Sequence, residues 1–443
     1  MMRKLTFTQG GVILPDRKHQ TRRSALWNAS IPRTSIVALH QHAGQTATAC
    51  VAPGDRVREG MLIGTACNGS SANVHSPIPG IVREIRRIRL PDGLVSDAVV
   101  IDMDGEFDRL GKQLVPFEWE ELDAGSIADL LADQGVVDMG GSLSPGQLLP
   151  AVSGERGCRL LILNGCESEP YLTGDHRIMV EHPSAVLTGL RIVARLLGAK
   201  RVVLGVQSDK PDAIAALEAA VRAEKLPHEV VALRVKYPQG DERQLVKVVS
   251  GREIPSGGSP IDVGCMILGV AAAYAVHDAV IYRKPVIERV VTVGGGAITR
   301  PANIKARIGT PVGDLIEECG GFRETPARLI AGGAMTGHAI EDLGTPITKR
   351  TAGVLALTAR EVKRATLAPC IECGRCTIAC PMGLSPTRLY KLIEHQQLTR
   401  AVSEGLLDCT ECGSCGYLCP SRIPLVEQMK IGKARIQGNG LCE

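Results

Sequence analysis

Apolar residues recur along the chain with different periods. Between about residues 35 and 105 they form short runs separated by Gly, Pro and Asp turns, which predicts a β domain of short strands. From about 120 to 280, continuous apolar runs alternate with amphipathic segments, which predicts a parallel sheet with helices on both sides. Short strands and glycine turns return from 285 to 355, with a helix expected at 312–319. Residues 385–407 have helical periodicity.

Within the α/β segment the pattern is specific enough to place elements. Residues 159–164 and 201–206 are continuous apolar runs, and we expect each to be a strand buried on both faces. Residues 184–197 and 212–225 have the spacing of amphipathic helices. The most apolar stretch, 265–276, is too short to cross a membrane and is predicted to be a buried core helix.

Composition narrows the class of protein. The chain has 443 residues and a net charge of only +4, with 4 Phe, 6 Tyr and 2 Trp. Neither a basic surface nor a set of stacking aromatics is indicated, so nucleic acid is not an expected partner. The first residues contain no apolar segment of the kind a secretory signal needs, and no transmembrane segment is expected. Fifteen cysteines in such a chain favour metal ligation over disulfides.

Eight of the cysteines lie in two copies of one pattern, C-x2-C-x2-C-x3-C-P, near the end of the chain. This spacing wraps thiolates around a [4Fe–4S] cube, and Gly374 and Gly413 are expected to relieve crowding in the two loops. Tetrahedral zinc is the alternative, but it needs neither four cysteines in each run nor the proline that follows. The sequence therefore predicts two iron–sulfur clusters.

The fourth cysteine of each run is expected to cross to the other cluster, as in two-cluster ferredoxins. The helical periodicity between the runs favours a helical dicluster domain over a compact β-hairpin ferredoxin. Under this assignment cluster I is held by Cys370, Cys373, Cys376 and Cys419. Cluster II is held by Cys409, Cys412, Cys415 and Cys380.

The first β domain resembles the barrel-sandwich fold of biotinyl and lipoyl carrier domains. Its phrases include Val51-Ala-Pro-Gly-Asp-Arg-Val and His75-Ser-Pro-Ile-Pro-Gly. A carrier needs a lysine at the tip of the exposed hairpin, and residues 68–73 contain none. We therefore expect a scaffold or docking domain without a covalent cofactor.

Several phrases, in one order along the chain, are similar to the C subunit of the Rnf complex, a membrane-bound assembly that couples ferredoxin and NAD to ion movement. The resemblance covers nearly the whole chain. This family is related to the NADH-oxidising flavoprotein subunit of respiratory complex I. Besides the two cysteine runs, the phrases are Thr8-Gln-Gly-Gly, Gln41-His-Ala-Gly, Val74-His-Ser-Pro, Asn164-Gly-Cys-Glu-Ser-Glu-Pro-Tyr-Leu, Tyr237-Pro-Gln-Gly-Asp-Glu and Ile254-Pro-Ser-Gly-Gly.

The resemblance implies a multidomain α/β protein in four parts. Residues 1–118 are expected to form the barrel-sandwich domain, and 119–283 a Rossmann-like α/β domain of the FMN/NADH type. Residues 284–356 are expected to form an SLBB β-grasp module. Residues 357–443 are expected to be the α-helical dicluster ferredoxin tail.

In that family, FMN and NADH bind in a pocket of the middle domain behind a glycine-rich loop that a lysine follows. The matching stretch here begins at Gly140 and Gly141, has lost one glycine and its aromatic residue, and has Leu149 in place of the lysine. The alternative for the acidic residues of the pocket is that they pair with Arg177 and Arg243 and only hold loops. Besides the two glycines, the resemblance implies cofactor-binding roles for Asn164, Glu167, Glu169, Gly240, Asp241 and Glu242.

The function implied is electron transfer by a peripheral subunit on the cytoplasmic face of the inner membrane. The expected cofactors are two [4Fe–4S] clusters, with FMN and NAD(H). The expected partners are the membrane-embedded and other subunits of the complex, and ferredoxin-like or NAD(H) electron carriers. Two alternatives stay open: a paralogue without FMN and NADH that relays electrons to or from another carrier or reductase, and a docking scaffold. Cys166 is expected to be an inert core cysteine, with a redox thiol as its alternative.

Overall fold

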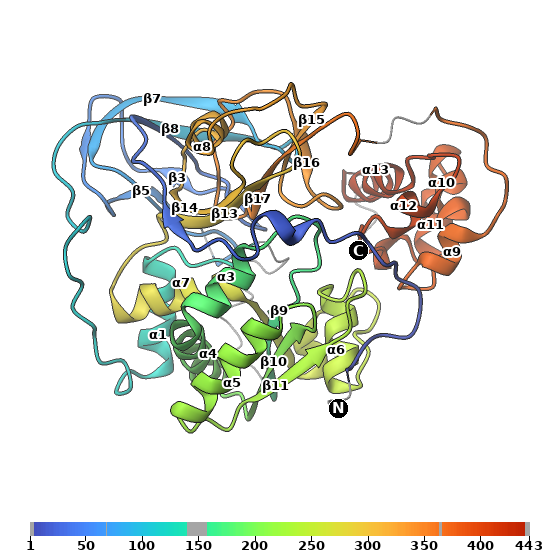
Figure 1. Cartoon of the computed structure of the whole chain (residues 1–443), viewed down its shortest axis with the longest axis horizontal. Helices are drawn as coiled ribbons and strands as arrows, with labels where there is room; N and C mark the ends of the chain where they lie inside the picture. Colours follow the sequence, from blue (N-terminus) through green and yellow to red (C-terminus); the bar gives the residue numbers. More distant parts are fainter. Residues whose placement is uncertain (1–3, 68, 140–156, 363–365, 439–443) are drawn as a thin grey trace.

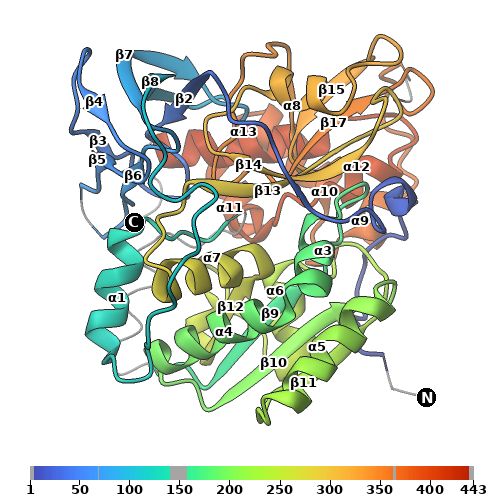
Figure 2. The same ribbon diagram turned by 60° about the vertical axis from the view of Figure 1, so that its left-hand side comes forward.

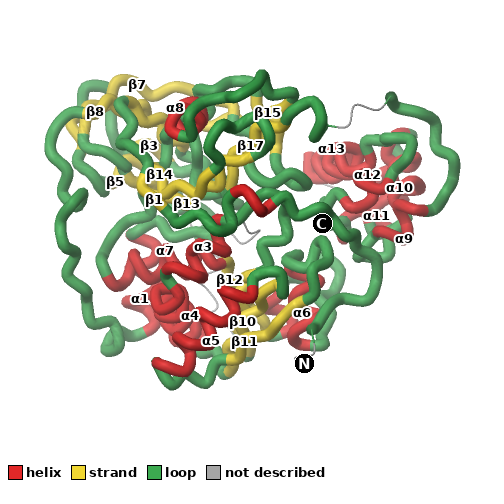
Figure 3. The backbone as a smooth tube through the Cα atoms, in the orientation of Figure 1, coloured by secondary structure: helices red, strands yellow, loops and turns green. Residues whose placement is uncertain are grey.

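The computed structural model describes residues 4–67, 69–139, 157–362 and 366–438. A β domain and a second sheet lie on one side of a parallel α/β domain, and a helical tail packs at one end of the molecule (Figure 1). Helices dominate the tail and much of the α/β domain, whereas the remaining parts consist mostly of strands and loops (Figure 3). The predicted succession of β, α/β, α+β and helical parts is confirmed.

The first β domain consists of a four-stranded and a three-stranded antiparallel sheet that share one apolar core. Val37 and Val99 from one sheet and Ile63 and Val74 from the other are at most 1% exposed. The four-stranded sheet has the order β2 (Thr34–Ala38), β8 (Val95–Met103), β7 (Gly80–Arg89) and β4 (Arg56–Val57). The other has β3 (Thr48–Ala49), β5 (Leu62–Thr65) and β6 (Val74–His75).

The α/β domain is built on a parallel sheet of order β11-β10-β9-β12. Leu161 and Leu163 of β9 pack into the core with most of the helices, whereas Leu160 and Ile162 face the α6 side. Because both faces are covered, the strands are apolar on both faces. Its strands are β9 (Leu160–Gly165), β10 (Arg201–Gln207), β11 (Glu229–Leu233) and β12 (Cys265–Gly269). Its helices are α1 (Ala124–Asp133), α3 (Gly174–Glu181), α4 (Pro183–Leu197), α5 (Pro211–Ala223), α6 (Glu242–Ser250), α7 (Val270–Ile281) and the short 3-10 helix η3 (Pro260–Val263).

The prediction of one core helix at 265–276 is wrong in its first part. Residues Cys265–Gly269 form β12, which pairs in parallel with β9, and only then does α7 begin. A short, fully buried strand and a buried helix have the same all-apolar pattern, so periodicity does not separate them. The four other elements placed from the sequence in this domain are present within two residues of their predicted bounds.

The second sheet has six strands and is covered by α8 (Val312–Glu318), the helix expected at 312–319. Gly320 and Gly321 follow this helix with φ of +80° and +72°, which is the usual left-handed end of a helix. The strand order is β1 (Trp27–Asn28), β14 (Ala302–Arg307), β13 (Glu288–Gly294), β17 (Gly353–Leu357), β15 (Arg328–Ala331) and β16 (His338–Ile340).

The tail consists of short helices around a small core that includes Leu389, Ile393, Leu406 and Met429. The helical periodicity of 385–407 is confirmed as two helices, separated at Gln396 by a left-handed backbone conformation with φ of +57°. The elements are α9 (Arg375–Ala379), α10 (Pro386–Glu394), α11 (Leu398–Ser403), the 3-10 helix η4 (Leu406–Asp408), α12 (Ser414–Leu418) and α13 (Leu425–Gly438).

Residues 4–28 form a strap that crosses the other parts of the molecule (Figures 1 and 2). Leu5 bridges to Leu233 at the end of β11, and Val12 forms an antiparallel bridge with Tyr237. The strap then turns through the 3-10 helix η1 (Lys18–Gln20) and adds β1 to the edge of the second sheet. No helix in the described part of the chain combines the length and the apolar character needed to cross a bilayer.

Candidate functional site

The eight cysteines of the two runs line two separate cavities in the tail. Cys370, Cys373, Cys376 and Cys419 lie on the wall of the first, which has a volume of about 310 Å³. Cys380, Cys409, Cys412 and Cys415 lie on the wall of the second. Each cavity thus takes three cysteines from one run and the fourth from the other, which are the sets predicted for clusters I and II.

The two cysteine loops have the same backbone conformation. Glu372 and Glu411 have φ of +53° and +56°, and the glycines that follow, Gly374 and Gly413, have φ of +69° and +82° and begin α9 and α12. This sharp turn of the chain is easiest at glycine and brings the cysteines of each run to one side of the loop. The prediction that these glycines relieve crowding is wrong at Gly374, where a Cβ would meet nothing within 4 Å, whereas at Gly413 a Cβ would lie 3.3 Å from Met335. At both positions the left-handed backbone favours glycine.

The spread of the sulfurs suits a cluster better than a single ion. Among the described residues, no three His, Cys, Asp or Glu side chains converge closely enough to hold one metal ion. A cubane is larger than an ion and takes its thiolates at separate corners. Backbone N–H groups already donate to two of the sulfurs: Glu372 to Cys370 and Leu384 to Cys380, both at 3.4 Å. Burial raises the pKa of Cys409 to about 11, so its thiolate form depends on iron ligation.

A third cavity, of about 580 Å³, lies between the α/β domain, the second sheet and the tail. We call it the central cavity. Cys409 and Cys412 form part of its wall, so it adjoins the cavity predicted for cluster II. Gly140 and Gly141 lie outside the described residues. The other predicted cofactor-binding residues all line the central cavity: Asn164, Glu167, Glu169, Gly240, Asp241 and Glu242.

The carboxylates of the central cavity are held by backbone N–H groups. Glu167 accepts from the amide of Asp175 at 2.8 Å, and Glu169 accepts from the amide of Met335 at 2.8 Å. Asp241 caps the N-terminus of α6 by accepting from two amides, at 3.1 and 3.2 Å. An ionised carboxylate has about four acceptor positions, so Glu167 and Asp241 keep capacity for a ligand hydroxyl. Glu169 also accepts from the amide and hydroxyl of Thr336 and faces the hydroxyl of Tyr237, so its positions are filled.

Arg177 and Arg243 do not form the ion pairs with these carboxylates that the alternative interpretation expects. Arg177 pairs with Glu181 at 2.7 Å, and Arg243 lies 3.6 Å from Asp408 of the tail. The alternative interpretation, in which the carboxylates hold loops, is right about the loops. It is wrong about the partners, which are backbone amides rather than Arg177 and Arg243.

Burial changes the protonation of this acidic wall. It raises the pKa of Asp241 to about 6 and also raises the pKa of Glu169. Burial and the nearby charge of Glu167 raise the pKa of Asp175. These carboxyl groups therefore take up protons at a less acidic pH than free carboxyl groups do.

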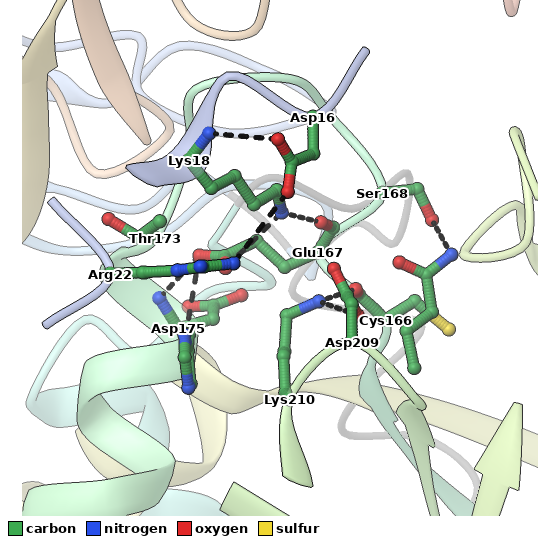
Figure 4. Close-up of polar contacts among 12 residues, drawn as sticks. Asp16, Lys18, Arg22, Cys166, Glu167, Ser168, Thr173, Asp175, Asp209 and Lys210 are labelled. Atoms are coloured by element: carbon green, nitrogen blue, oxygen red, sulfur yellow. Dashed lines mark hydrogen bonds and ion pairs between the residues drawn. The ribbon is translucent and has the colours of Figure 1, made fainter. Parts of the chain in front are cut away.

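Two lysines approach the loop after β9 from opposite sides (Figure 4). Lys18, from the strap, donates to the carbonyl of Glu167 and lies 3.6 Å from its carboxylate. Lys210 donates to the carbonyl of Cys166 at 2.8 Å. Burial and the charge of Lys210 lower the pKa of Lys18 to about 8. No sequence pattern pointed to Lys18, because its role depends on where the strap crosses the domain.

Cys166 is fully buried, and burial raises the pKa of its thiol to about 12. A reactive cysteine needs an exposed, readily ionised thiol. Cys166 is therefore a core residue, as expected.

Arg289 is a further residue of the central cavity that the sequence did not indicate. It comes from β13 of the second sheet and is 4% exposed, and its Nη1 is buried without a hydrogen-bond partner in the described part of the chain. A buried guanidinium donor of this kind is suited to an anionic group in the cavity. It provides a cation in a chain whose glycine-rich stretch lacks the lysine that the resemblance implies. The unpartnered Nη1 of Arg289 and the carboxylate acceptors of the wall fit the phosphate and the hydroxyl groups of a flavin mononucleotide.

Two cysteine-lined cavities, one of which adjoins a large polar cavity, define an iron–sulfur electron-transfer protein with an attached flavin-type domain. Models of four known domains match the chain in the predicted order: the RnfC barrel sandwich hybrid domain at 6–106 and the Nuo51 FMN-binding domain at 131–278. The SLBB domain matches 290–339, and the 4Fe-4S dicluster domain matches 363–420.

Curated relatives establish the family. The chain is 40% identical to the C subunit of the ion-translocating oxidoreductase complex of Rhodobacter capsulatus, covering 97% of this chain and 83% of that protein. It is 38% identical to the C subunit of the proton-translocating ferredoxin:NAD(+) oxidoreductase complex of Clostridium ljungdahlii, covering 90% and 87%. The chain belongs to the RnfC family, the C subunits of ion-translocating oxidoreductase complexes.

Among solved structures, the fold is similar to a chain of an NAD+-reducing [NiFe]-hydrogenase in its H2-reduced state. The TM-score is 0.50 at 16% identity, over 71% of this chain and 61% of that one. This likeness supports the fold of the chain only.

Proposed function

We propose that this chain is the electron-transfer C subunit of an Rnf-type, ion-translocating ferredoxin:NAD+ oxidoreductase complex. It relays electrons between NAD(H) and FMN on one side and membrane subunits on the other, through two [4Fe–4S] clusters. In this role it lies peripherally on the cytoplasmic face of the inner membrane and binds the membrane-embedded and other subunits. The four-part division at residues 118, 283 and 356 is proposed with it.

One observation carries this proposal: the central cavity and the predicted cluster II cavity share a wall. Cys409 and Cys412 line both cavities. Electron transfer between cofactors needs them close together, and a cofactor in the central cavity would be next to cluster II. The family models for FMN binding and for the dicluster domain match the two sides of this wall.

The ligands follow from the two cavities in the tail. We assign cluster I to the cavity lined by Cys370 and its three partners, and cluster II to the cavity lined by Cys412 and its three partners. The crossing of Cys380 and Cys419 joins the two loops, and α9 and α12, which carry these loops, pack against each other.

In the central cavity, we assign FMN to the wall formed by the acidic loop residues and Arg289. Bound there, FMN would take two electrons from NADH and pass them on singly. The chain's own residues would bind and orient it: Arg289 supplies a buried cation, and Glu167 and Asp241 supply acceptors for hydroxyl groups. We propose that the chain therefore has its own NADH:acceptor activity despite the altered glycine-rich loop.

Cluster I would exchange electrons with the partner subunits. Cys373 is exposed, and Ile371 and Ile378, on the same loop and helix, are 67% and 76% exposed. An exposed apolar rim around an electron-transfer centre is suited to a transient protein contact.

The test is anaerobic reconstitution of the purified chain with iron, sulfide and FMN, followed by addition of NADH. We expect bound flavin and bleaching of the visible cluster absorbance by NADH. Bleaching by dithionite alone, without bound flavin, would contradict the FMN and NADH assignment and leave a cluster relay. Absence of any bleachable absorbance would favour the docking scaffold.

A further inference from the structure

Three motifs that are far apart in the sequence meet beside cluster II. The strap brings Thr8-Gln-Gly-Gly between the α/β domain and the tail, where Figure 1 shows it passing next to α9. The loop that begins at Tyr237 and the Cys380-Pro381 end of the first cysteine run complete the junction. The function proposed above uses the cysteines but gives no role to the strap motif or to Tyr237.

Gly10 and Gly11 hold the backbone that carries Cys380. The N–H of Gly11 donates to the carbonyl of Ala379 at 2.8 Å. Gly10 has φ of +60°, and a Cβ on it would lie 2.3 Å from the carbonyl oxygen of Cys380. Because that neighbour is backbone, no side chain could move aside, so only glycine allows the strap to pass this close.

Tyr237 holds the other side of the same cluster. Its hydroxyl donates to the carbonyl of Cys412 at 2.7 Å, and the side chain is 5% exposed. Its own backbone is paired twice with Val12 of the strap, through N–H to carbonyl bonds of 2.8 Å in each direction.

The cysteines assigned to cluster I have contacts of a different origin. The amide of Glu372 donates to Cys370 at 3.4 Å, and Thr387 lies 4.0 Å from the sulfur of Cys376. Both residues belong to the tail. In the described part of the chain, the contacts from the strap and from Tyr237 thus act on cluster II ligands.

We propose that the strap motif and Tyr237 form a clasp that positions cluster II against the central cavity, with Tyr237 as a positioning residue that acts through Cys412. This inference depends on the ligand assignment in the proposed function. The hydroxyl donates to the carbonyl of Cys412 and so draws electron density away from the backbone next to cluster II. Lower electron density there favours the more negative, reduced cluster, so we expect this hydrogen bond to raise the reduction potential of cluster II. Tyr237 contacts a cysteine assigned to cluster II, so the potential of cluster I should not depend on its hydroxyl.

The decisive experiment is a redox titration followed by low-temperature electron paramagnetic resonance (EPR) on the reconstituted full chain. In Tyr237→Phe, the ring is kept and only the donor is lost, so we expect cluster II to shift to a more negative midpoint potential with an altered signal. Cluster I should keep its potential and signal. Tyr171→Phe is the matched control, because Tyr171 is also buried and donates at 3.0 Å to Glu361, away from the clusters.

A second variant tests the strap. Gly10→Ala should lose or broaden the cluster II signal and keep that of cluster I. Gly93→Ala is its control: Gly93 also has a left-handed φ, +88°, but a Cβ there meets nothing within 4 Å. Tyr237→Phe keeps the proposal testable if Gly10→Ala does not fold.

These experiments distinguish failure of the clasp from failure of the proposed function. The wild-type spectrum alone decides whether two clusters are present. With both present, unchanged cluster II signals and potentials in Tyr237→Phe and Gly10→Ala would overturn the clasp. Equal shifts of both clusters would also overturn it, because they would indicate a general disturbance of the tail.

Discussion

Cys419 of the second cysteine run lies with Cys370 of the first on the wall of one cavity. The reciprocal exchange places Cys380 with the three remaining cysteines of the second run. Under the proposed ligand assignment the two loops are held together through the clusters, and loss of one crossing cysteine should affect the cluster of the opposite run.

This gives a direct prediction for single cysteine variants. Cys380→Ala should resemble Cys412→Ala, with damage to cluster II, and should differ from Cys376→Ala, its neighbour in the same run. Iron analysis should fall from about eight toward about four atoms per chain in each variant, and EPR should identify which cluster is left. A Cys380→Ala spectrum that matches Cys376→Ala would mean that the runs bind their clusters without crossing.

Arg289 should determine affinity for the phosphate of the flavin. Charge-assisted hydrogen bonds contribute about 1.5–3 kcal/mol, so Arg289→Met should weaken FMN binding roughly 10- to 100-fold. Riboflavin, which lacks the phosphate, should bind the variant and the wild type with similar affinity. Quenching of flavin fluorescence measures both, and an equal loss for the two ligands would show that Arg289 supports the fold of the cavity instead.

The burial of Lys349 predicts that the stability of the protein depends on pH. Its fully buried ammonium donates to the carbonyl groups of Asn73 and Gly135, from the β domain and the α/β domain, at 3.0 and 2.6 Å. Burial lowers the pKa of Lys349 to about 7. Between this value and its unfolded pKa near 10.5, the unfolded chain binds a proton that the folded chain lacks, so stability should rise with pH across this window.

The slope should reach as much as about 1.4 kcal/mol per pH unit and should disappear in Lys349→Met. Lys391→Met is the control, because the side chain of Lys391 is 61% exposed. Thermal unfolding midpoints between about pH 6.5 and 10 provide the measurement. Parallel pH profiles for wild type and Lys349→Met would contradict the buried, deprotonating lysine.

A buried ion pair joins the β domain to the second sheet. Arg307 lies 2.7 Å from Glu59, and their side chains are 6% and 1% exposed. Arg307→Met leaves a buried carboxylate without its cation and should cost roughly 3–5 kcal/mol in the free energy of unfolding. Arg83→Met removes an exposed pair with Asp102 and should cost about 0–1 kcal/mol. Equal costs in denaturant unfolding would refute the importance of the buried pair.

Features that depend on neighbours in the sequence could be predicted. The cysteine spacing, the left-handed glycines and the strands of the α/β domain follow from local pattern, and the domain order follows from the resemblance. The prediction of a helix at 265–276 is wrong for residues 265–269, because a fully apolar run has no periodicity that separates a strand from a helix.

The parts of the site that depend on tertiary contacts were not visible in the sequence. Arg289 is the one cation of strand β13, and Lys18 lies in the strap outside its Thr8-Gln-Gly-Gly motif. Arg289 reaches the central cavity, and Lys18 reaches the loop after β9, only because the second sheet and the strap pack on the α/β domain. The local sequence pattern does not reveal such contacts between distant segments.

The central claim is that the tail holds two cubane clusters. Its most direct test is low-temperature EPR of the anaerobically reconstituted chain after reduction with dithionite, with iron and sulfide analysis of the same sample. We predict about eight iron and eight sulfide per chain and the signals of two reduced [4Fe–4S] centres. Bound zinc in place of iron, or a reduced sample without any such signal, would contradict the account.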